Sequence, residues 1–188
     1  MQDTQDSIST WTSDKLMLLN PAKCNYMIFS RSKEDFATRL TINNSVLERV
    51  KVSKILGVWI DDDLSWSRNC QEICVKAYSR LQMITKLKYV GVKIEDLIDV
   101  YVLYIRSLTE YCSVAFHPGL SNEQSNKLER IQKMYIGYEA ALEMTGLETL
   151  FDRRLKRCLD FSLKCANHVR NDRLFPLNKI TNTHDVRN

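Results

Sequence analysis

Residues 54–87 read KILGVWIDDDLSWSRNCQEICVKAYSRLQMITKL, and within this stretch the hydrophobic period changes from that of a strand to that of a helix. Ile55–Ile60 is a short apolar run of mostly branched and aromatic residues, which predicts a buried β-strand closed by Asp61–Asp63. Apolar residues then recur every three or four positions, which predicts one face of a long helix: Ile73, Ala77, Leu81, Ile84 and Leu87. The chain should therefore combine a β-containing part with a helical part.

The residues before this stretch predict a small helix-plus-sheet unit. Ser7–Leu19 is predicted as a helix that Asn20-Pro21 ends, and Cys24–Phe29 as a buried strand. A hairpin should follow at Asn43-Asn44, because asparagine tolerates positive φ and this pair lies between two apolar segments, Leu40–Ile42 and Ser45–Leu47.

The residues after the long helix predict further helices. The second helix is predicted on one apolar face, formed by Leu97, Tyr101, Tyr104, Ile105, Leu108, Tyr111 and Cys112. Pro118-Gly119 ends it, and Ser121 with Gln124 three residues later predicts the start of the next helix. A final amphipathic helix is predicted from Leu155, Cys158, Leu159, Ser162, Cys165, Ala166 and Val169.

These patterns predict the α+β class, with a hairpin-containing sheet fragment followed by a mostly helical bundle. We divide the chain into a sheet-containing fragment at 1–62, a helical region at 63–177 and a tail at 178–188.

Composition narrows the class of protein further. The 188 residues are 44% hydrophobic and 27% charged, enough for one domain or two small subdomains with a core. No apolar run reaches the roughly 18–20 residues that cross a bilayer. Six scattered cysteines at mostly apolar positions indicate an intracellular protein, in cytoplasm or nucleus, with reduced thiols. The net charge of +4 permits a nucleic-acid partner without requiring one.

Several segments resemble those of one family. Residues 19–30, LNPAKCNYMIFS, resemble the segment that follows the catalytic motif in reverse transcriptases of non-LTR (LINE-type, jockey-like) retrotransposons. Residues 54–61 with Leu64-Ser65-Trp66 resemble the family's next landmark. Downstream segments resemble the later helical region in the expected order: Leu87–Val92, Tyr104–Ser107, Glu110–Cys112, Leu128–Lys133, Arg153-Arg154, Arg157–Leu159 and Arg173–Pro176. The similarity covers nearly the whole chain.

The resemblance implies the end of a polymerase palm, including the hairpin that grips the primer, followed by a thumb-like bundle. In the family a Phe/Tyr-Ala-Asp-Asp turn lies upstream of the segment that begins near Trp11, and this sequence does not contain it. Polymerase chemistry needs Mg²⁺ ions held by such carboxylates. We therefore expect a truncated RNA-directed DNA polymerase fragment that is not an enzyme alone and has no cofactor, although the parent enzyme uses Mg²⁺.

A second departure follows Lys133. The family carries several more residues there before a Tyr-x-x-Tyr stretch like Tyr135–Tyr138, which implies an internal deletion of about three helical turns or less.

Asp61–Asp63 could be read as a metal site or as a helix cap. The run follows the Leu-Gly-Val landmark, which places it after the family's true catalytic turn. It also precedes a helix, where Asp63 or Ser65 can cap free N–H groups and where acidic charge suits the helix dipole. We favour capping.

Lys23 matches the family's lysine near the leaving pyrophosphate, where it acts as an acid or an electrostatic stabiliser. Without a triphosphate site that role is vestigial, and we favour the alternative of a solvated lysine before a strand.

Cys70 and Cys74 lie four residues apart on one helical face, a spacing that can chelate a metal ion. A structural zinc site needs four ligands, and His117, the nearest helper, belongs to another helix. We therefore predict no metal site and core cysteines.

Two groups of basic residues are candidate phosphate contacts for a primer–template duplex: Lys86 and Lys88, and Arg153, Arg154, Lys156 and Arg157 with Lys164, Arg170 and Arg173 beyond them. An ordinary solvated helix face explains them equally well. Tyr101, Tyr104 and Tyr111 could offer a stacking platform for bases, but their helical spacing favours the bundle core.

Two functions follow from the sequence. The first is a polymerase-derived scaffold with residual, sequence-independent binding of DNA or RNA through weak phosphate contacts. The alternative is a host-recruited helical protein-interaction module with no nucleic-acid role. For that module we expect a protein partner to cover apolar residues that a missing palm exposes: Met27, Phe29, Val58 and Trp59.

Overall fold

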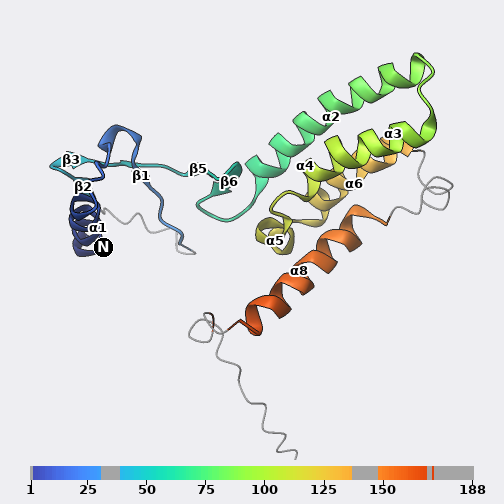
Figure 1. Cartoon of the computed structure of the whole chain (residues 1–188). Helices are drawn as coiled ribbons and strands as arrows, with labels where there is room; N and C mark the ends of the chain where they lie inside the picture. The colour runs from blue at the N-terminus through green and yellow to red at the C-terminus, as the bar shows by residue number, and fades with distance from the viewer. Residues whose placement is uncertain (1, 31–38, 137–147, 169–170, 172–188) are drawn as a thin grey trace, which may run out of the picture. The chain divides into compact units, whose positions relative to one another are not determined.

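The computed structural model describes residues 2–30, 39–136, 148–168 and 171, and it confirms the α+β class (Figure 1). The chain divides into two compact units. The first unit comprises Met1–Lys76 with Gly119–Gln124, and the second comprises Ala77–Pro118 with Ser125–Asn188. The boundary between the two units lies within helix α2, Ser67–Tyr89, whose first turns belong to the first unit. The predicted tail at 178–188 lies outside the described residues.

Among its described residues, the first unit contains helix α1, three two-stranded sheets and the first turns of α2. Helix α1 is followed by the 3-10 turn η1 and six short strands: α1 Gln2–Asp14, η1 Pro21–Lys23, β1 Asn25–Tyr26, β2 Thr41–Ile42, β3 Ser45–Val46, β4 Glu48–Arg49, β5 Val52–Ile55 and β6 Val58–Asp61. β1 pairs with β4 in parallel, whereas β2 with β3 and β5 with β6 are antiparallel. A small core of Leu40, Ile42 and Leu47 holds the first strands together.

The predicted hairpin at Asn43-Asn44 is confirmed. Asn43 and Asn44 both have positive φ, 48° and 62°, and Ile42 pairs directly with Ser45. Two consecutive residues in this conformation give the turn whose twist matches the flanking strands, and asparagine adopts it at low cost.

The prediction of one buried strand over Ile55–Ile60 is wrong. Leu56 and Gly57 have φ values of 49° and 90°, and they form a second tight turn, so Ile55 pairs with Val58. The apolar run hid the turn, whose one sequence signal is Gly57. The predicted strand over Cys24–Phe29 is also shorter than expected, since it pairs only at Asn25–Tyr26.

Helix α1 begins earlier than predicted and ends at Asp14. Its side towards β2 is polar. The Gln2 amide donates to the Thr41 carbonyl oxygen and accepts from the Thr41 N–H, both at 3.1 Å. The apolar side chains of Ile8 and Trp11 are exposed by 46% and 56%. Backbone pairing by Gln2, which the hydrophobic pattern does not encode, therefore decides which face of α1 turns inward.

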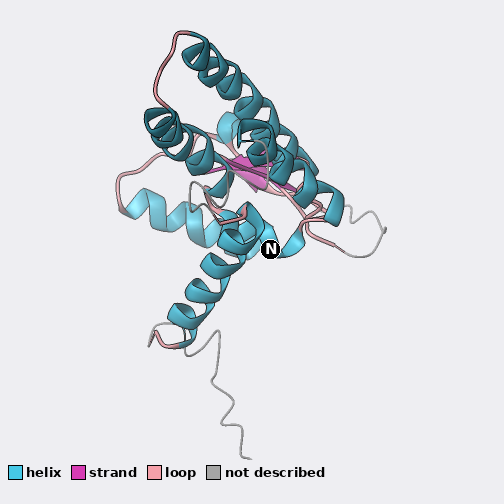
Figure 2. Cartoon of the chain, turned by 90° about the vertical axis from the view of Figure 1, so that its right-hand side faces the viewer, coloured by secondary structure: helices cyan, strands magenta, loops and turns pink. Residues whose placement is uncertain are grey.

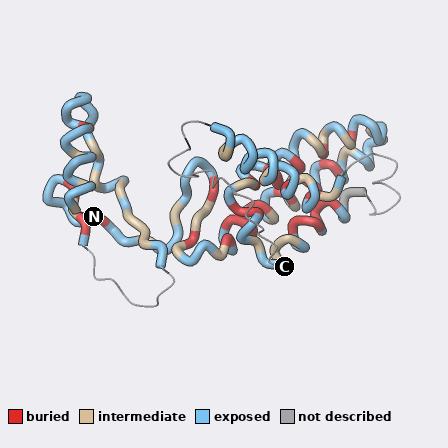
Figure 3. Tube along the Cα trace, turned by 90° about the horizontal axis from the view of Figure 1, so that it is seen from below, coloured by how far each residue is buried: buried red, intermediate tan, exposed pale blue. Residues whose placement is uncertain are grey.

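The described residues after β6 are mostly helical, and Figure 2 colours the helices cyan. Its elements are α2 Ser67–Tyr89, α3 Ile94–Tyr101, the π-helical turn η2 Val102–Arg106, α4 Ser107–Glu110, α5 Ser113–Phe116, the 3-10 turn η3 His117–Gly119, α6 Asn122–Ile136 and α8 Leu150–Ala166. Most of the buried residues lie on these helices (Figure 3). The predicted buried face of α2 is confirmed at Ile73, Ala77, Leu81 and Ile84. Among the described residues, no helix is both long and apolar enough to cross a bilayer.

The predicted second helix is interrupted twice, which corrects the tyrosine stripe. Tyr101 is fully buried, and its hydroxyl donates to the Gln132 side chain at 3.0 Å. Tyr104 and Tyr111 are exposed by 52% and 54%, so the core prediction is wrong for both. The wider π-turn changes the phase of the helix after Tyr101. The left-handed conformation of Cys112, with φ 52°, then ends the run.

The next helix start is confirmed as a capping box. The Gln124 N–H donates to the Ser121 hydroxyl at 3.2 Å, and the Ser121 N–H donates to the Gln124 side-chain oxygen at 2.8 Å. This reciprocal pair satisfies two N–H groups at the beginning of α6.

Helix α8 is fixed at its beginning by side chains of α6. The Glu129 carboxylate accepts the Leu150 and Phe151 N–H groups at 3.3 and 3.2 Å, and the Gln132 amide donates to the Glu148 carbonyl oxygen at 3.1 Å. The predicted apolar face of α8 is wrong, since Leu155 and Leu159 are exposed by 41% and 57%. The buried side instead carries Leu150 and Arg154, both at 0%.

Candidate functional site: the charged side chains and groove of the second unit

Glu110, at the end of α4, lies at the centre of a buried ion cluster. Its side chain is 3% exposed. Arg106 Nε donates to it at 3.1 Å, Arg153 Nε at 2.5 Å and Arg157 contributes Nη2 at 3.0 Å. Burial alone raises the pKa of Glu110, but the hydrogen bond and charge of Arg153, with the charge of Arg157, outweigh it and lower the pKa. The carboxylate is thus held ionised and ties α8 to the α4 segment.

This cluster occupies Arg153 and Arg157, which the sequence predicted as phosphate contacts. Arg153 is only 29% exposed and also approaches Glu148 at 3.7 Å. Arg157 is 50% exposed but is oriented by Glu110. Both guanidinium groups are engaged by a carboxylate, which reduces the charge that they can offer to a phosphate.

Arg154 does not lie on the surface at all. Its side chain is 0% exposed, its Nε donates to His117 Nδ1 at 3.4 Å, and its Nη2 donates to the Ser125 hydroxyl at 3.4 Å. The His117 ring also meets the Phe151 ring edge-on, with centroids 5.2 Å apart. Burial and the neighbouring Arg154 charge both lower the pKa of His117. Arg154 is therefore a packing residue of the second unit.

The other predicted basic residues that the structure describes are exposed. Lys86 and Lys88 lie in the last turn of α2, where the helix dipole favours positive charge. Lys156 is exposed on α8, and Lys23 is exposed at the end of η1 in the first unit. Apart from Arg157, which Glu110 engages, the exposed candidate phosphate contacts are thus lysines. Arg170 and Arg173 lie outside the described residues.

In the run Asp61–Asp63, the carboxylates of Asp61 and Asp63 accept hydrogen bonds from their own loop. Asp61 is buried and accepts the Ser65 hydroxyl at 3.2 Å, and Asp63 accepts the Ser65 N–H at 2.9 Å. The hydrogen bond from the Ser65 backbone is the main reason that the pKa of Asp63 is lowered. The carboxylate therefore stabilises the turn just before α2 rather than the first N–H groups of the helix itself.

Replacing Asp63 by alanine should lower the free energy of unfolding by about 1 kcal/mol, because one turn hydrogen bond is lost. Thermal unfolding of wild type and Asp63→Ala, each with and without Mg²⁺, measures both effects. A large loss of Mg²⁺ affinity in the variant would show that the run holds a metal ion.

The prediction that Cys70 and Cys74 are core cysteines is confirmed for Cys70 and is met only partly by Cys74. Cys70 is buried and its thiol contacts the Gln124 carbonyl oxygen at 3.7 Å, whereas Cys74 is half-buried. None of the six cysteines forms a disulfide bond, and no group of three or more metal-ligating side chains occurs in the part of the chain that the structure describes.

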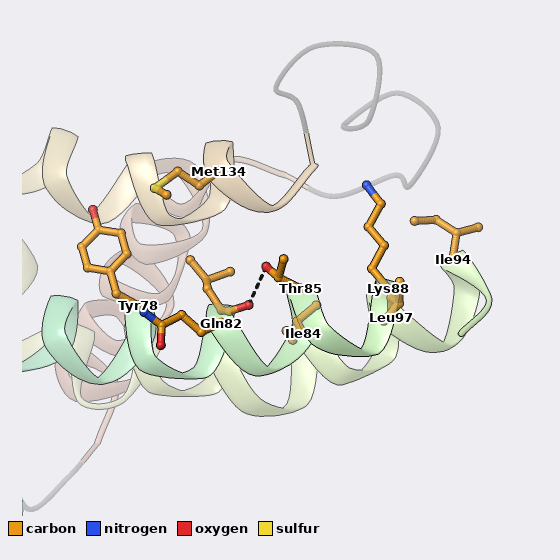
Figure 4. Close-up of a pocket in the computed structure, with 9 residues that line it drawn as sticks. Tyr78, Gln82, Ile84, Thr85, Lys88, Ile94, Leu97 and Met134 are labelled. Carbon is orange, nitrogen blue, oxygen red and sulfur yellow. Dashed lines mark hydrogen bonds between the residues drawn. The ribbon is translucent and has the colours of Figure 1, made fainter. Parts of the chain in front are cut away.

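A groove of about 500 Å³ lies between α2, α3 and α6 (Figure 4). Leu81, Ile84 and Leu97 are buried and form an apolar floor. The remaining described lining residues are Tyr78, Gln82, Thr85, Lys88, Ile94 and Met134. Its volume falls in the range of small-molecule sites. We call this set of residues the α2 groove.

Sequence reasoning missed both the Glu110 cluster and the α2 groove. Arg153 and Glu110 are 43 residues apart, and no local pattern reports such a contact. The signal at Glu110 was a carboxylate one helical turn after Arg106, a spacing that predicts an ion pair.

We compared the chain with protein-family models, with curated proteins and with solved structures, and none of the three comparisons gives a match.

Proposed function

We propose that this chain is a polymerase-derived scaffold that binds DNA or RNA duplexes through phosphate contacts and has no polymerase activity alone. The exposed lysines of the second unit are the observation that carries the proposal, namely Lys86, Lys88 and Lys156. The sequence resemblance to non-LTR reverse transcriptases supports it, because the thumb of a polymerase lies against the duplex. The proposal places the chain in the cytoplasm or nucleus.

Binding of this kind is sequence-independent and sensitive to salt. Each lysine that neutralises a phosphate contributes about one unit to the slope of log affinity against log salt concentration. The double variant Lys86→Glu/Lys156→Glu should therefore bind a labelled RNA–DNA duplex more weakly and lower that slope by about two. Fluorescence anisotropy at several salt concentrations, with two unrelated duplex sequences, measures both quantities.

Lys15→Glu is the matched control, since Lys15 is exposed and follows α1 in the first unit. Its affinity should fall only by the small general effect of net charge. Equal losses in both variants, or binding that ignores salt, would contradict the phosphate model. Primer extension with Mg²⁺ tests the second half of the proposal, and clear nucleotide incorporation by the pure protein would refute it.

A second function, a helical protein-interaction module, is favoured by a different observation. Phe151, Leu155, Leu159 and Leu163 follow one another at intervals of four residues along α8 and are exposed by 41–63%. A continuous exposed apolar surface of this kind is typical of a site that contacts another protein. If the duplex assay shows no binding at low salt, this second function replaces the first.

A further inference from the structure

We propose that the α2 groove binds a long-chain carboxylate, with the carboxylate at Lys88 and the aliphatic chain along the groove. This inference goes beyond the proposed nucleic-acid function, with which it shares only Lys88. It rests on the shape of the groove, the chemistry of its floor and the position of one cation.

The floor is built to hold an apolar chain. Leu81 and Ile84 of α2 and Leu97 of α3 are exposed by only 8%, 2% and 2%. Ile94 and Met134 add apolar side chains at the walls, and an unbranched methionine adapts readily to an irregular ligand. Ile94 and Met134 are exposed by 55% and 69%, so an aliphatic chain packed against them removes apolar surface from water on both sides of the contact.

The groove is elongated and its two ends differ. Figure 4 shows Tyr78, Gln82 and Met134 towards one end and Lys88, Ile94 and Leu97 towards the other. From Tyr78 to Lys88, ten residues of α2 span about 15 Å. The site therefore suits an extended chain with its polar group at one end.

The positive charge of Lys88 favours a negatively charged polar group on the ligand. It is the one charged side chain among the described residues that line the groove. The Thr85 hydroxyl already donates to the Leu81 carbonyl oxygen at 3.0 Å, as the dashed line in Figure 4 marks, so it offers no proton to a ligand. An ammonium group beside an apolar floor selects an anionic head over a neutral one.

The test uses displacement of a dansyl-labelled long-chain carboxylate from the full chain by dodecanoate or by dodecanol. Dodecanoate should compete at least about tenfold better than dodecanol, because only the acid gains a charge-assisted bond to Lys88. Lys88→Glu should weaken probe binding by about tenfold or more, and Lys88→Met by a smaller factor.

Two further variants keep the test decisive. Lys76→Glu is the matched control, since Lys76 is exposed on the same helix and does not line the groove. It should leave probe affinity unchanged. Thr85→Trp places a bulky ring in the middle of the groove and should abolish binding while circular dichroism shows the native helix content.

The proposal is overturned if the probe does not bind, if dodecanol competes as well as dodecanoate, or if Lys76→Glu weakens binding as much as Lys88→Glu. Retention of the probe by Thr85→Trp would place its binding on another surface and overturn the proposal as well.

Discussion

Replacing Glu110 by leucine is expected to lower the free energy of unfolding by about 3–4 kcal/mol. The substitution removes the carboxylate that Arg106, Arg153 and Arg157 share, and it leaves Arg106, which is only 8% exposed, without a counter-charge. Breaking a buried pair on one side costs about 3–5 kcal/mol. The lower part of that range applies because Arg153 and Arg157 reach solvent. Chemical denaturation followed by circular dichroism measures the change.

Glu72→Gln is the matched control for this effect. Glu72 forms a partly exposed pair with Arg68 at 2.9 Å, one helical turn away on α2. Pairs four residues apart on a helix contribute about 0.3–0.5 kcal/mol. A Glu110 variant no less stable than the Glu72 variant would mean that the buried cluster does not hold α8 in place.

The cluster also sets a pH dependence. The pKa of Glu110 lies below its usual value of 4.5 in the folded chain. The stability that the ionised carboxylate supplies is therefore complete above about pH 4.5 and is lost as the pH falls below that value. In Glu110→Leu this acid-dependent part of the unfolding free energy should be smaller than in wild type.

Replacing Arg154 by leucine is expected to cost about 2–4 kcal/mol, the second large effect. The guanidinium is fully buried and donates to both His117 and Ser125, so its removal takes a donor from the buried His117 ring and from the partly buried Ser125 hydroxyl. Lys156→Gln, two residues away and exposed, should change stability by less than about 0.5 kcal/mol. Thermal and chemical unfolding of the two variants side by side would separate a packing role from a surface role for Arg154.

His117 should make the stability of the folded chain depend on pH. Its folded pKa lies below the ordinary value of 6.5, so the folded chain favours the neutral ring whose Nδ1 accepts from Arg154. Stability should therefore be complete above about pH 6.5 and should fall as the pH decreases below it, since the unfolded chain binds the proton more readily. His117→Gln should weaken this dependence, whereas His168→Gln should leave it unchanged, since His168 is exposed and follows the end of α8. Identical pH profiles for both variants would refute the assignment.

Local rules recovered the parts of the fold that local chemistry decides. The Asn43-Asn44 hairpin, the Ser121/Gln124 capping box and the buried face of α2 all follow from short-range patterns. The turn at Leu56-Gly57 was missed because Leu56 is a poor residue for positive φ, and tertiary context overrode its preference.

The charged site shows what local sequence patterns do not predict. Arg153, Arg154 and Arg157 look equivalent in sequence, yet one is fully buried and two share a carboxylate from a distant helix. Helical periodicity gives the relative angle between side chains but not which side meets the rest of the molecule. An apolar row on α8 suggested one buried face, whereas the ion cluster and the Arg154 contacts turned another face inward. Periodicity therefore recovered the helix but not its orientation.

The two bonds that Glu129 accepts from the start of α8, with the Gln132 bond to Glu148, have a consequence for how this chain tolerates change in length. The end of α6 and the start of α8 are registered by these bonds, and none of them involves the side chains of residues 137–147. Lengthening or shortening a connection whose ends are already fixed changes closure entropy slowly, by about 0.6 kcal/mol for each doubling. The fold should therefore tolerate insertions and deletions between the two helices without a shift of α8. Copies of such a chain that differ in this connection can still share one bundle.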